Sequence, residues 1–518
     1  MKKSLIRQST SNVLVSIIAR IVVMLLPFVV RTVIIRTLGN LYVGVDSLFS
    51  SILNMLSLSE LGFSSAVVYA MYKPVAENDE EKVRALLCFY KRVYQIVGCV
   101  ILGVGLILLP NIKFFIAKGT EYPTDINIYI VYLILLINTS ISYFFFAYKN
   151  SLLVATMRND LDSLIEMCRS LVSHLLQIAI LLIFRNYYLY VVILPIVTLA
   201  NNIVRNVIIN KKYPQYKGSK SKLSQEDKKD IMTRVGALVG HKLGGFVFTS
   251  VDSLVISAFL GLTILGQYSN YYSIFAAVYA MESTIYTAIQ STIGNILVTK
   301  SQEECYKIFK SIFIVNAAVT CFCTLCFLTL YQPFMRLWIG EGSLLGYEIP
   351  ILLAAYYFVK STRRVLFVFK EAAGMWRENL LMPYISVAVN VIFNILLVKT
   401  IGLPGVIISS IAAILLVEMP WETVVFFKKY FKAHQKAYWG KVVLVTILCV
   451  LLSGFSVALY YLVSNWISNL ILQMVILLFM CLIITAIVYV PILIYSEEGK
   501  MIKPYIKSLF QKQKKSLK

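Results

Sequence analysis

Two arginines in the first long apolar segment are the residues of this chain that most clearly suggest a chemical role. Arg20 and Arg31 are spaced so that they share one helix face with Pro27, with the two arginines roughly 16 Å apart along the helix axis. An arginine at membrane depth costs at least about 2.5–3.5 kcal/mol on insertion scales. The pair therefore indicates either an anion-binding site in a hydrated cavity or an internal salt bridge, such as one between Arg20 and Glu60.

This charged stretch recurs in the second half of the chain at a constant offset of about 222 residues. Arg20 aligns with Lys242, and Glu60 aligns with Glu282. The same register also aligns Leu38-Gly39 with Leu260-Gly261, Gly44 with Gly266, Ser47 with Ser269, and Ser51-Ile52 with Ser273-Ile274. A repeated hydrophobic unit with matched ionisable residues at membrane depth is typical of a transporter that consists of two related halves.

The second copy carries aromatic residues where the first copy carries small polar ones. A helical stripe of the first copy presents Asp46, Ser50, Leu53, Ser57, Glu60 and Ser64, and the equivalent stripe of the second presents Tyr268, Tyr272, Phe275, Tyr279, Glu282 and Tyr286. Tyrosine rings stack on the apolar faces of sugars, and their hydroxyls reach hydrogen-bond partners. Tyr268, Tyr272 and Tyr279 are therefore candidate substrate-binding residues, and a packed aromatic helix interface is the alternative.

Three carboxylates at membrane depth are candidates for coupling transport to Na⁺ or H⁺. Asp252 lies in an otherwise apolar run and could also pair with a basic residue of the other half, while Glu60 and Glu282 hold repeat-equivalent positions. Burial raises the pKa of a carboxyl group, so such groups can exchange a proton or a cation near physiological pH. Glu418 and Glu422 lie near the predicted cytoplasmic end of a span, where the simplest interpretation is that they snorkel to the membrane surface.

No nucleotide-binding or metal-binding motif accompanies these residues. The chain has no G-x-x-x-x-G-K-[ST] phosphate loop, so it is not expected to hydrolyse ATP. Asp160 and Asp162 have the carboxylate spacing that glycosyltransferases use, but no nucleotide-binding domain surrounds them. Cys321, Cys323 and Cys326 lie in mid-span without a neighbouring His or carboxylate, which favours small buried apolar side chains. We expect no catalytic residues, metal or cofactor, and therefore no enzyme.

The composition requires an integral membrane protein. Of the 518 residues, 59% are hydrophobic and only 14% are charged, and the mean hydropathy is +0.77. Apolar runs of roughly 20 residues recur from end to end and predict an all-α fold of about fourteen transmembrane helices. The predicted spans lie near 12–38, 43–70, 86–110, 127–148, 161–184, 187–209, 232–260, 265–297, 308–330, 346–369, 379–399, 402–427, 441–463 and 467–495.

The net charge of +23 follows the predicted topology and does not indicate nucleic-acid binding. Lysine and arginine concentrate in alternate loops, and the positive-inside rule makes these loops, together with both termini, cytoplasmic. One such loop is the polar segment 211–230. Another holds Lys360, Arg363, Arg364 and Lys370.

The repeat and the polar segment predict the domain organisation. Residues 1–210 form an N-terminal lobe of spans 1–6, 211–230 form a cytoplasmic inter-lobe linker, 231–428 form a C-terminal lobe of spans 7–12, and 429–518 hold spans 13–14 and a basic cytoplasmic tail. Because each copy has an even number of spans, the two six-helix lobes are expected to be parallel repeats related by an axis along the membrane normal. Arg20 and Lys242 should then face one shared cavity.

Several short motifs resemble those of bacterial Wzx-type polysaccharide flippases. Those similar to the first lobe are Arg36-Thr-Leu-Gly39, Tyr42-Val-Gly44, the run Leu-Ser-Glu-Leu-Gly-Phe at 58–63, and Tyr72-Lys-Pro74. Those similar to the opening of the second lobe are Ser250-Val-Asp252, Leu260-Gly261 and Gly-Gln-Tyr-Ser-Asn-Tyr at 266–271. The aromatic–lysine steps Tyr148-Lys149 and Phe369-Lys370 also fit. The resemblance covers essentially the whole chain.

This family belongs to the multidrug/oligosaccharidyl-lipid/polysaccharide exporter superfamily. The resemblance implies a V-shaped, two-lobed, alternating-access transporter in the bacterial cytoplasmic (inner) membrane. The substrate that it implies is a lipid-linked, usually undecaprenyl-diphosphate, oligosaccharide that crosses to the outer leaflet for a surface polysaccharide such as capsule or exopolysaccharide. Arg20, Arg31 and Lys242 could neutralise its diphosphate. The expected partners are this substrate, bilayer lipids, and the polymerase and glycosyltransferases of the pathway, with no nucleic acid.

Two other functions remain open at the level of the sequence. The first is a cation-coupled multidrug or lipid-precursor exporter on the same scaffold, which a cavity poorer in cations would favour. The second is a membrane polysaccharide polymerase or ligase, which should carry a large extracytoplasmic loop. The longest predicted outside loops, near 111–125 and 332–345, are short.

Overall fold

All regular secondary structure that the computed structural model describes is helical. The description covers residues 23–57, 63–216, 223–375, 378–431 and 434–500, apart from the side chains of 65, 159, 230, 234 and 236–249. The chain divides into two compact units, Met1–Gly266 and Gln267–Lys518. The lobe and linker boundaries expected from the sequence stay a prediction.

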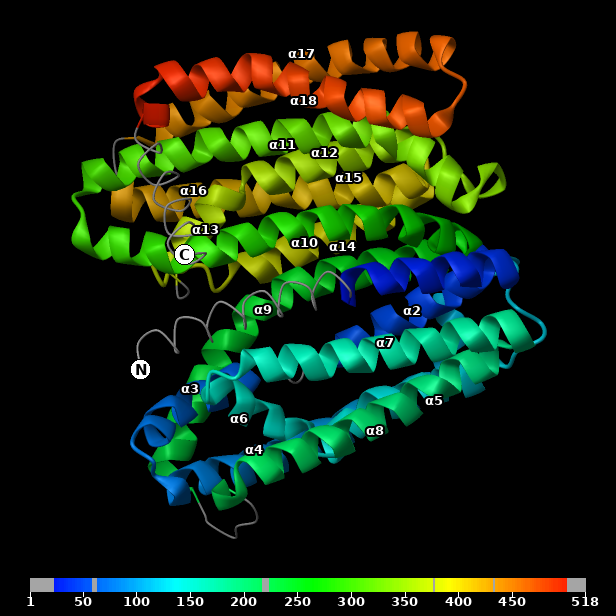
Figure 1. The fold of residues 1–518 in the computed structure, drawn as a ribbon, viewed down its shortest axis with the longest axis vertical. Coiled ribbons are helices and arrows are strands. Elements are labelled where there is room, and N and C mark those ends of the chain that lie inside the picture. The colour runs from blue at the N-terminus through cyan, green and yellow to red at the C-terminus, as the bar shows by residue number, and fades with distance from the viewer. Residues whose placement is uncertain (1–22, 58–62, 217–222, 376–377, 432–433, 501–518) are drawn as a thin grey trace, which may run out of the picture. The chain divides into compact units, whose positions relative to one another are not determined.

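The first unit is a bundle of long helices that begins with the helix through residues 23–37. The elements that follow are α2 (Asn40–Leu56), α3 (Phe63–Ala76), α4 (Glu80–Leu108), η2 (Leu109–Phe115), α5 (Ile128–Phe144), η3 (Ala147–Lys149), α6 (Asn150–Ala155), α7 (Asn159–Phe184), α8 (Tyr187–Lys212), η4 (Pro214–Tyr216) and α9 (Gln225–Leu260). Helix α5 packs against α4 and α8, α7 packs against α8, and α2 packs against α9 (Figure 1).

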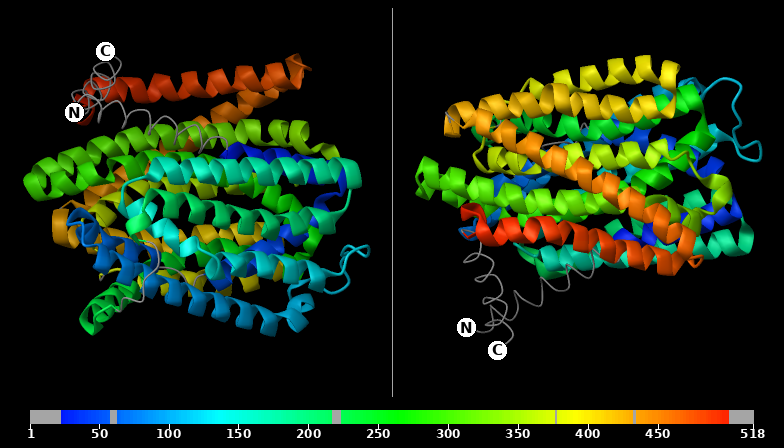
Figure 2. Two further views of the ribbon diagram at one scale, coloured as in Figure 1. Left: turned by 60° about the horizontal axis from the view of Figure 1, so that its bottom comes forward. Right: turned by 90° about the horizontal axis from the view of Figure 1, so that it is seen from above.

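The second unit is organised around its longest helices. Its elements are α10 (Leu262–Thr299, which begins in the first unit), α11 (Gln302–Ile339), η5 (Glu341–Ser343), α12 (Glu348–Thr362), α13 (Arg364–Ala372), α14 (Met382–Ile401), α15 (Leu403–Ala413), η6 (Ile414–Glu418), α16 (Met419–Phe426), η7 (Phe427–Phe431), α17 (Gln435–Trp466) and α18 (Leu470–Tyr495). Helix α11 packs against α12, α17 and α18, and α14 packs against α15 (Figure 2).

Polar caps set where many of these helices begin. Asp79 accepts a hydrogen bond from the backbone of the first turn of α4, and Asn186 does the same for α8. Ser301 and Glu304 form a reciprocal capping box at the start of α11. Such caps satisfy backbone N–H groups that have no partner inside the helix, which matters most where the chain leaves water.

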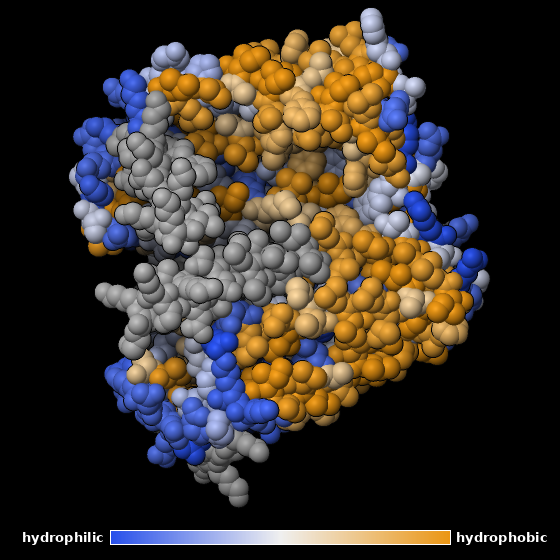
Figure 3. Space-filling model, viewed as in Figure 1, coloured by the Kyte–Doolittle hydropathy of each residue, from blue (hydrophilic) through white to orange (hydrophobic). Residues whose placement is uncertain are grey.

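The long helices make this a multi-pass membrane protein. Eight described helices are long and apolar enough to cross a bilayer, or nine if the pair α5 and Ala147–Ala155, bent by 51°, counts as one span. Apolar side chains cover α7 and α8 in the first unit and α17 and α18 in the second (Figure 3). Each predicted span coincides, in its described residues, with one helix or consecutive helices. The count of fourteen crossings stays a prediction.

The glycines of the repeat adopt matching conformations in the two copies. Gly39 precedes α2 with φ 97° and ψ 174°, and Gly261 precedes α10 with φ 91° and ψ 172°. Only glycine enters this backbone region without strain. The repeat that the sequence reveals therefore preserves a specific helix-to-helix turn.

Gly44 and Gly266, the next repeat-equivalent glycines, each contact the other copy of the repeat. A Cβ atom at Gly44 would overlap the carbonyl oxygen of Leu262, and a Cβ atom at Gly266 would overlap the carbonyl oxygen of Asn40. Asn40 and Leu262 are themselves repeat-equivalent, so each copy makes the same contact to the other. The two backbones approach closely here because neither glycine has a side chain.

Glu498, which follows α18 in the chain, forms ion pairs with lysines on two other helices of the second unit. Its Oε1 atom lies 3.0 Å from Nζ of Lys441 on α17 and 3.2 Å from Nζ of Lys310 on α11. Partial burial alone would raise the pKa of this carboxyl group, but the hydrogen bonds from Lys441, its own backbone and Lys310 lower it to about 2. Because the folded-state pKa lies below the ordinary value, this stabilisation is present above about pH 4.5 and is lost as the pH falls towards 2.

The glycine contact gives a stability prediction. Gly44→Ala and Gly266→Ala should each lower the unfolding free energy by about 1–3 kcal/mol, because a methyl group would force two backbones apart. Thermal unfolding of the purified protein in detergent measures the effect. Gly103 on α4 is the control, since a Cβ there meets nothing within 4 Å, and Gly103→Ala should be neutral or stabilising. Equal stability of all three variants would contradict the close contact.

Candidate functional site

Three of the residues predicted from the sequence fall outside what the structure describes. Arg20 and Glu60 lie in segments outside the described residues, and Lys242 lies on α9 with its side chain outside the description. The shared cavity of Arg20 and Lys242, and the alternative salt bridge between Arg20 and Glu60, therefore stay predictions.

Arg31 and Asp252 are described, and both lie in the first unit. Arg31 is partly buried and interacts electrostatically with Asp46 of α2 and Tyr190 of α8. Asp252 is buried in α9. Arg31 therefore has an acidic neighbour within its own unit, which the sequence alone did not indicate.

The predicted tyrosine stripe lies along α10 and is partly packed. Tyr268 and Phe275 are buried, whereas Tyr272 and Tyr279 are half-buried. The Phe275 ring stacks on Tyr356 of α12 with centroids 4.8 Å apart. The stripe thus contributes to an aromatic helix interface, while Tyr272 and Tyr279 keep part of their surface accessible.

Glu282 is a buried carboxylate that hydroxyl groups hold. It is 4% exposed, and it accepts hydrogen bonds from Tyr357 (2.8 Å) and from Ser361 (2.6 Å), both on α12. Asn316 of α11 extends the network by donating to the Ser361 carbonyl at 2.9 Å. Within the described residues no ion pair to Glu282 occurs. The described hydrogen-bond donors to this carboxylate are therefore neutral hydroxyl groups.

A buried ion-pair network adjoins α10 in the same unit. Arg363 donates from Nε and Nη2 to the two oxygens of Glu422, at 2.6 and 2.8 Å, and from Nη1 to Glu418. Lys370 donates to Glu422 at 2.8 Å. Lys370 and Glu422 are both fully buried. Mutual neutralisation allows these charges to lie inside an apolar bundle.

This network corrects one interpretation of the sequence and adds detail to another. Lys360, Arg363, Arg364 and Lys370 were counted among the cations of a cytoplasmic loop, and the structure places them on or at the ends of α12 and α13. Glu418 and Glu422 were expected to snorkel to the surface, but both are buried. The spacing of the two glutamates, which share one helix face, was the signal that could have predicted a common partner.

Arg364 and Lys360 lie beside this network on the tyrosine stripe. Arg364 donates to the Tyr279 hydroxyl at 3.0 Å and to the Ser283 hydroxyl, and its guanidinium lies 5.2 Å from the Tyr279 ring centroid. Lys360 Nζ lies 4.6 Å from the same centroid. Two cations therefore share one aromatic ring, an arrangement that favours an anion nearby.

Helix α14 contributes a separate buried polar ladder. Ser386, Asn390 and Asn394 follow one helix face. Ser386 donates to Glu418 at 2.9 Å, and Asn390 donates to Ser410 of α15 at 3.1 Å. The hydrogen bond from Ser386 holds one oxygen of Glu418, so the ion pair with Arg363 has a defined geometry.

The aromatic–lysine step that recurs in the sequence has a different partner in each copy. Lys149 Nζ donates to the side-chain oxygens of Asn206 and Asn210 of α8. Its counterpart Lys370 donates to Glu422 of α16. The repeat preserves the lysine, and in the second copy its partner is a carboxylate.

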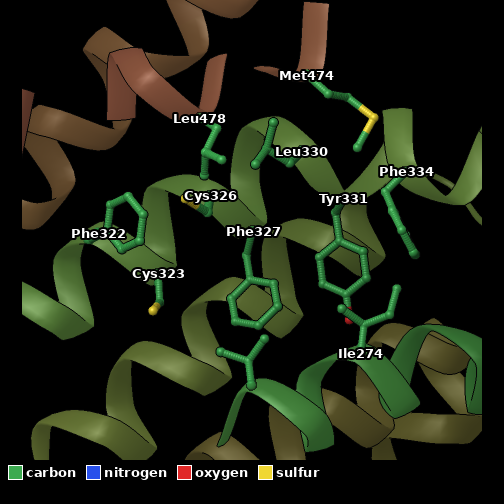
Figure 4. A pocket seen from close by; sticks show the side chains of 11 residues that line it. Ile274, Phe322, Cys323, Cys326, Phe327, Leu330, Tyr331, Phe334, Met474 and Leu478 are labelled. Carbon is green, nitrogen blue, oxygen red and sulfur yellow. The ribbon is translucent and has the colours of Figure 1, made fainter. Parts of the chain in front are cut away.

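An apolar cavity of about 330 Å³ lies in the second unit (Figure 4). Ile274 of α10, Phe327 and Phe334 of α11, and Met474 and Leu478 of α18 line it. These side chains offer no hydrogen bonds, so the cavity suits an alkyl or prenyl chain.

One aromatic ring connects this cavity with the acidic site. Phe327 lines the cavity, and its ring packs at 5.0 Å from Tyr357, which donates to Glu282. An apolar compartment and a polar site therefore adjoin each other within one unit.

A comparison with protein families finds a match over more than half of the chain. The family described as "Polysaccharide biosynthesis protein" matches residues 9–291. No curated protein sequence matches the chain significantly.

The chain shares its fold with solved structures of a flippase and of multidrug transporters. The chain is similar to "Lipid II flippase MurJ, inward closed conformation", with a TM-score of 0.65 and 14% identity over 92% of this chain and 99% of that one. It is also similar to an inward-facing multidrug resistance MATE family transporter of the MOP superfamily, with a TM-score of 0.57 and 16% identity over 83% and 99% of the two chains. These matches confirm the fold predicted from the sequence, and the family match supports the predicted superfamily.

The buried ion pairs give a prediction with an internal control. Glu422→Ala should lower the unfolding free energy by about 3–5 kcal/mol, because it leaves Arg363 and Lys370 as buried, under-compensated charges. The control is Glu378→Ala, which removes a 2.8 Å ion pair to Lys429 whose side chains are 39% and 54% exposed. It should cost less than about 1 kcal/mol. Thermal unfolding in detergent compares them, and a Glu422→Ala variant as stable as Glu378→Ala would contradict the network.

Proposed function

The chain belongs to the polysaccharide biosynthesis protein family, and on that premise we propose that it is a flippase for a lipid-linked oligosaccharide. The substrate would move from the inner to the outer leaflet of the bacterial cytoplasmic membrane for surface polysaccharide synthesis. The observation that carries the proposal is the composition of the second unit, where cations, an aromatic stripe, a buried acid and an apolar cavity adjoin one another. The cations suit an anionic group, the aromatic stripe suits sugars and the apolar cavity suits part of a lipid tail, while the buried acid is a candidate for ion coupling.

Each part of the proposed substrate has a candidate partner. Arg20, Arg31 and Lys242 are the proposed ligands of a diphosphate, because arginine and lysine neutralise phosphate oxygens. Tyr272 and Tyr279 keep exposed ring surface on which sugars can stack. We propose a polyprenyl carrier, undecaprenyl diphosphate in particular, since a long prenyl chain can occupy apolar cavities and the bilayer itself.

Transport must draw on an energy source other than a nucleotide site of this chain. We propose that a carboxylate among Asp252, Glu282 and Glu60 binds H⁺ or Na⁺. Glu282 is the leading candidate because hydroxyl donors rather than cations hold it. A buried carboxylate whose partners are neutral can change its charge without breaking an ion pair.

An exporter of drugs or of other lipid precursors is the second candidate, since the fold is shared with multidrug resistance transporters. The cations beside the tyrosine stripe, Lys360 and Arg364, favour an anionic, sugar-bearing substrate over an apolar drug. In the proposed pathway, glycosyltransferases supply the lipid-linked substrate on the cytoplasmic side and a polymerase consumes it outside. Both termini are proposed to be cytoplasmic.

Depletion of the protein in its host tests this function. Lipid-linked oligosaccharide should accumulate in the inner leaflet while surface polysaccharide falls, because synthesis continues without export. The wild-type gene and the Lys73→Ala variant, which alters an 82% exposed side chain, should restore the polysaccharide. Arg20→Ala should not, although its membrane level should match wild type. Unchanged lipid-linked pools after depletion would reject the flippase, and loss of the Arg20→Ala protein from the membrane would favour the internal salt bridge.

Neutralised carboxylates test the coupling. In reconstituted vesicles under an imposed Na⁺ or H⁺ gradient, at least one of Glu282→Gln, Asp252→Asn and Glu60→Gln should lose gradient-dependent flipping, because an amide cannot exchange a cation or a proton. Glu303→Gln is the control, since that side chain is 78% exposed. If all three variants flip at the wild-type rate with the same gradient dependence, the carboxylates are structural.

A further inference from the structure

Arg364 is a buried guanidinium whose hydrogen-bonding capacity is not fully used. The residue is 9% exposed, and its only hydrogen-bond acceptors in the described part of the chain are the hydroxyls of Tyr279 and Ser283. Its Nε atom is buried and has no hydrogen-bond partner. No described carboxylate forms an ion pair with it. A buried cation without a counter-charge costs several kcal/mol, so its retention requires an explanation.

The adjacent residue, Arg363, is an arginine whose positive charge is neutralised by two carboxylates. Arg363 binds Glu422 through two nitrogens and Glu418 through a third. Glu422 of α16 and Glu418 of η6 therefore pair with Arg363 and Lys370. The described hydrogen-bond partners of Arg364 are neutral hydroxyl groups. The two neighbouring arginines differ in partners, although both lie at the α12–α13 junction.

A second cation lies beside Arg364, and the nearby Glu282 carboxylate is hydrogen-bonded to Tyr357 and Ser361 and forms no ion pair with Arg364 within the described residues. Lys360, one helical turn earlier, lies over the same Tyr279 ring as Arg364. Phe367 lies 5.6 Å from the guanidinium. Tyr279, Ser283 and Lys360 are all half-buried, so the cluster opens to the surface on their side. Two cations and an aromatic ring fixed around one partly open position form a site of positive potential.

We propose that Arg364, Lys360 and Tyr279 form an oxyanion-binding subsite in the second unit. Arginine presents Nε and one Nη atom along one edge, which matches the two oxygens of a phosphate or a carboxylate. The Tyr279 and Ser283 hydroxyls hold the guanidinium until the ligand arrives, and Tyr279 offers its ring to an adjoining sugar. The oxyanion is either a phosphate of the lipid carrier or the carboxylate of an acidic sugar. This subsite rests on the proposed flippase function and is separate from Arg20, Arg31 and Lys242.

Binding measurements on the full chain in nanodiscs test the subsite. The probes are undecaprenyl diphosphate, undecaprenol and a glucuronic-acid-containing oligosaccharide, each titrated against wild type, Arg364→Gln, Arg364→Lys and Lys360→Gln. Arg364→Gln should weaken binding of one oxyanion probe about tenfold or more, because it removes a charge-assisted hydrogen-bonded contact. Arg364→Lys should recover only part of that loss, since it keeps the charge but not the planar fork. Undecaprenol should bind all variants equally.

Thermal unfolding separates this role from a structural one. Arg364→Gln should unfold at a temperature equal to or above that of wild type, because it removes an uncompensated buried charge. Arg363→Gln, the matched control, should be destabilised because it strands Glu418 and Glu422. Loss of diphosphate binding alone assigns the subsite to the carrier lipid, and loss of uronate binding alone assigns it to the glycan.

The failure of this inference and that of the proposed function are distinguishable. If wild type binds and flips the lipid-linked substrate and Arg364→Gln binds every probe normally, the subsite is wrong and the flippase stands. If Arg364→Gln is destabilised as strongly as Arg363→Gln, Arg364 is structural and the subsite is also rejected. If wild type binds no oxyanion probe, the subsite is rejected, and the flippase is rejected only if wild type also fails to move the lipid-linked substrate between leaflets.

Discussion

A charged side chain inside an apolar bundle must be neutralised by a partner or used by the function, and this constraint organises the second unit. Glu418 and Glu422 neutralise Arg363 and Lys370, and the Ser386 hydroxyl orients Glu418. Glu282 and Arg364, by contrast, are held by hydroxyl groups. Because the desolvation cost of an unpaired charge is several kcal/mol, the fully paired residues are best understood as structural. The incompletely paired ones are those that a substrate or an ion could engage.

The positions of the helices and the equivalent positions of the internal repeat were predictable from the sequence. Hydrophobic run length gave the positions of the helices, because a bilayer requires about 20 apolar residues per crossing. The offset of the repeat was also sufficient to pair Gly39 with Gly261, which share one backbone conformation. It paired Gly44 with Gly266 as well, although their reciprocal contact could not be inferred from the alignment.

Features that depend on contacts distant in the sequence were not predictable. Counting cations by loop assigned Arg363 and Lys370 to a cytoplasmic loop without predicting their ion pairs, because the positive-inside rule considers charge and not partners. Their neutralisation depends on Glu422, more than fifty residues away, whose position follows from how α13 and α16 pack. The binding and coupling roles predicted for the site residues stay predictions. Glu282 and Tyr279 do lie in a charged cluster, but the cations beside them are Lys360 and Arg364, which the sequence analysis did not select.

Quenching of a fluorescent substrate in proteoliposomes tests most directly whether the protein moves a lipid-linked oligosaccharide between leaflets. A fluorescent polyprenyl-diphosphate oligosaccharide is reconstituted in both leaflets, and a membrane-impermeant quencher is added outside. In vesicles that contain the protein, the inner-leaflet pool should cross to the outer leaflet and be quenched there as well. Protein-free vesicles should retain that fluorescence. Retention of the inner-leaflet signal in the presence of folded protein, together with export of a cationic dye by the same vesicles, would contradict the flippase and identify a drug exporter.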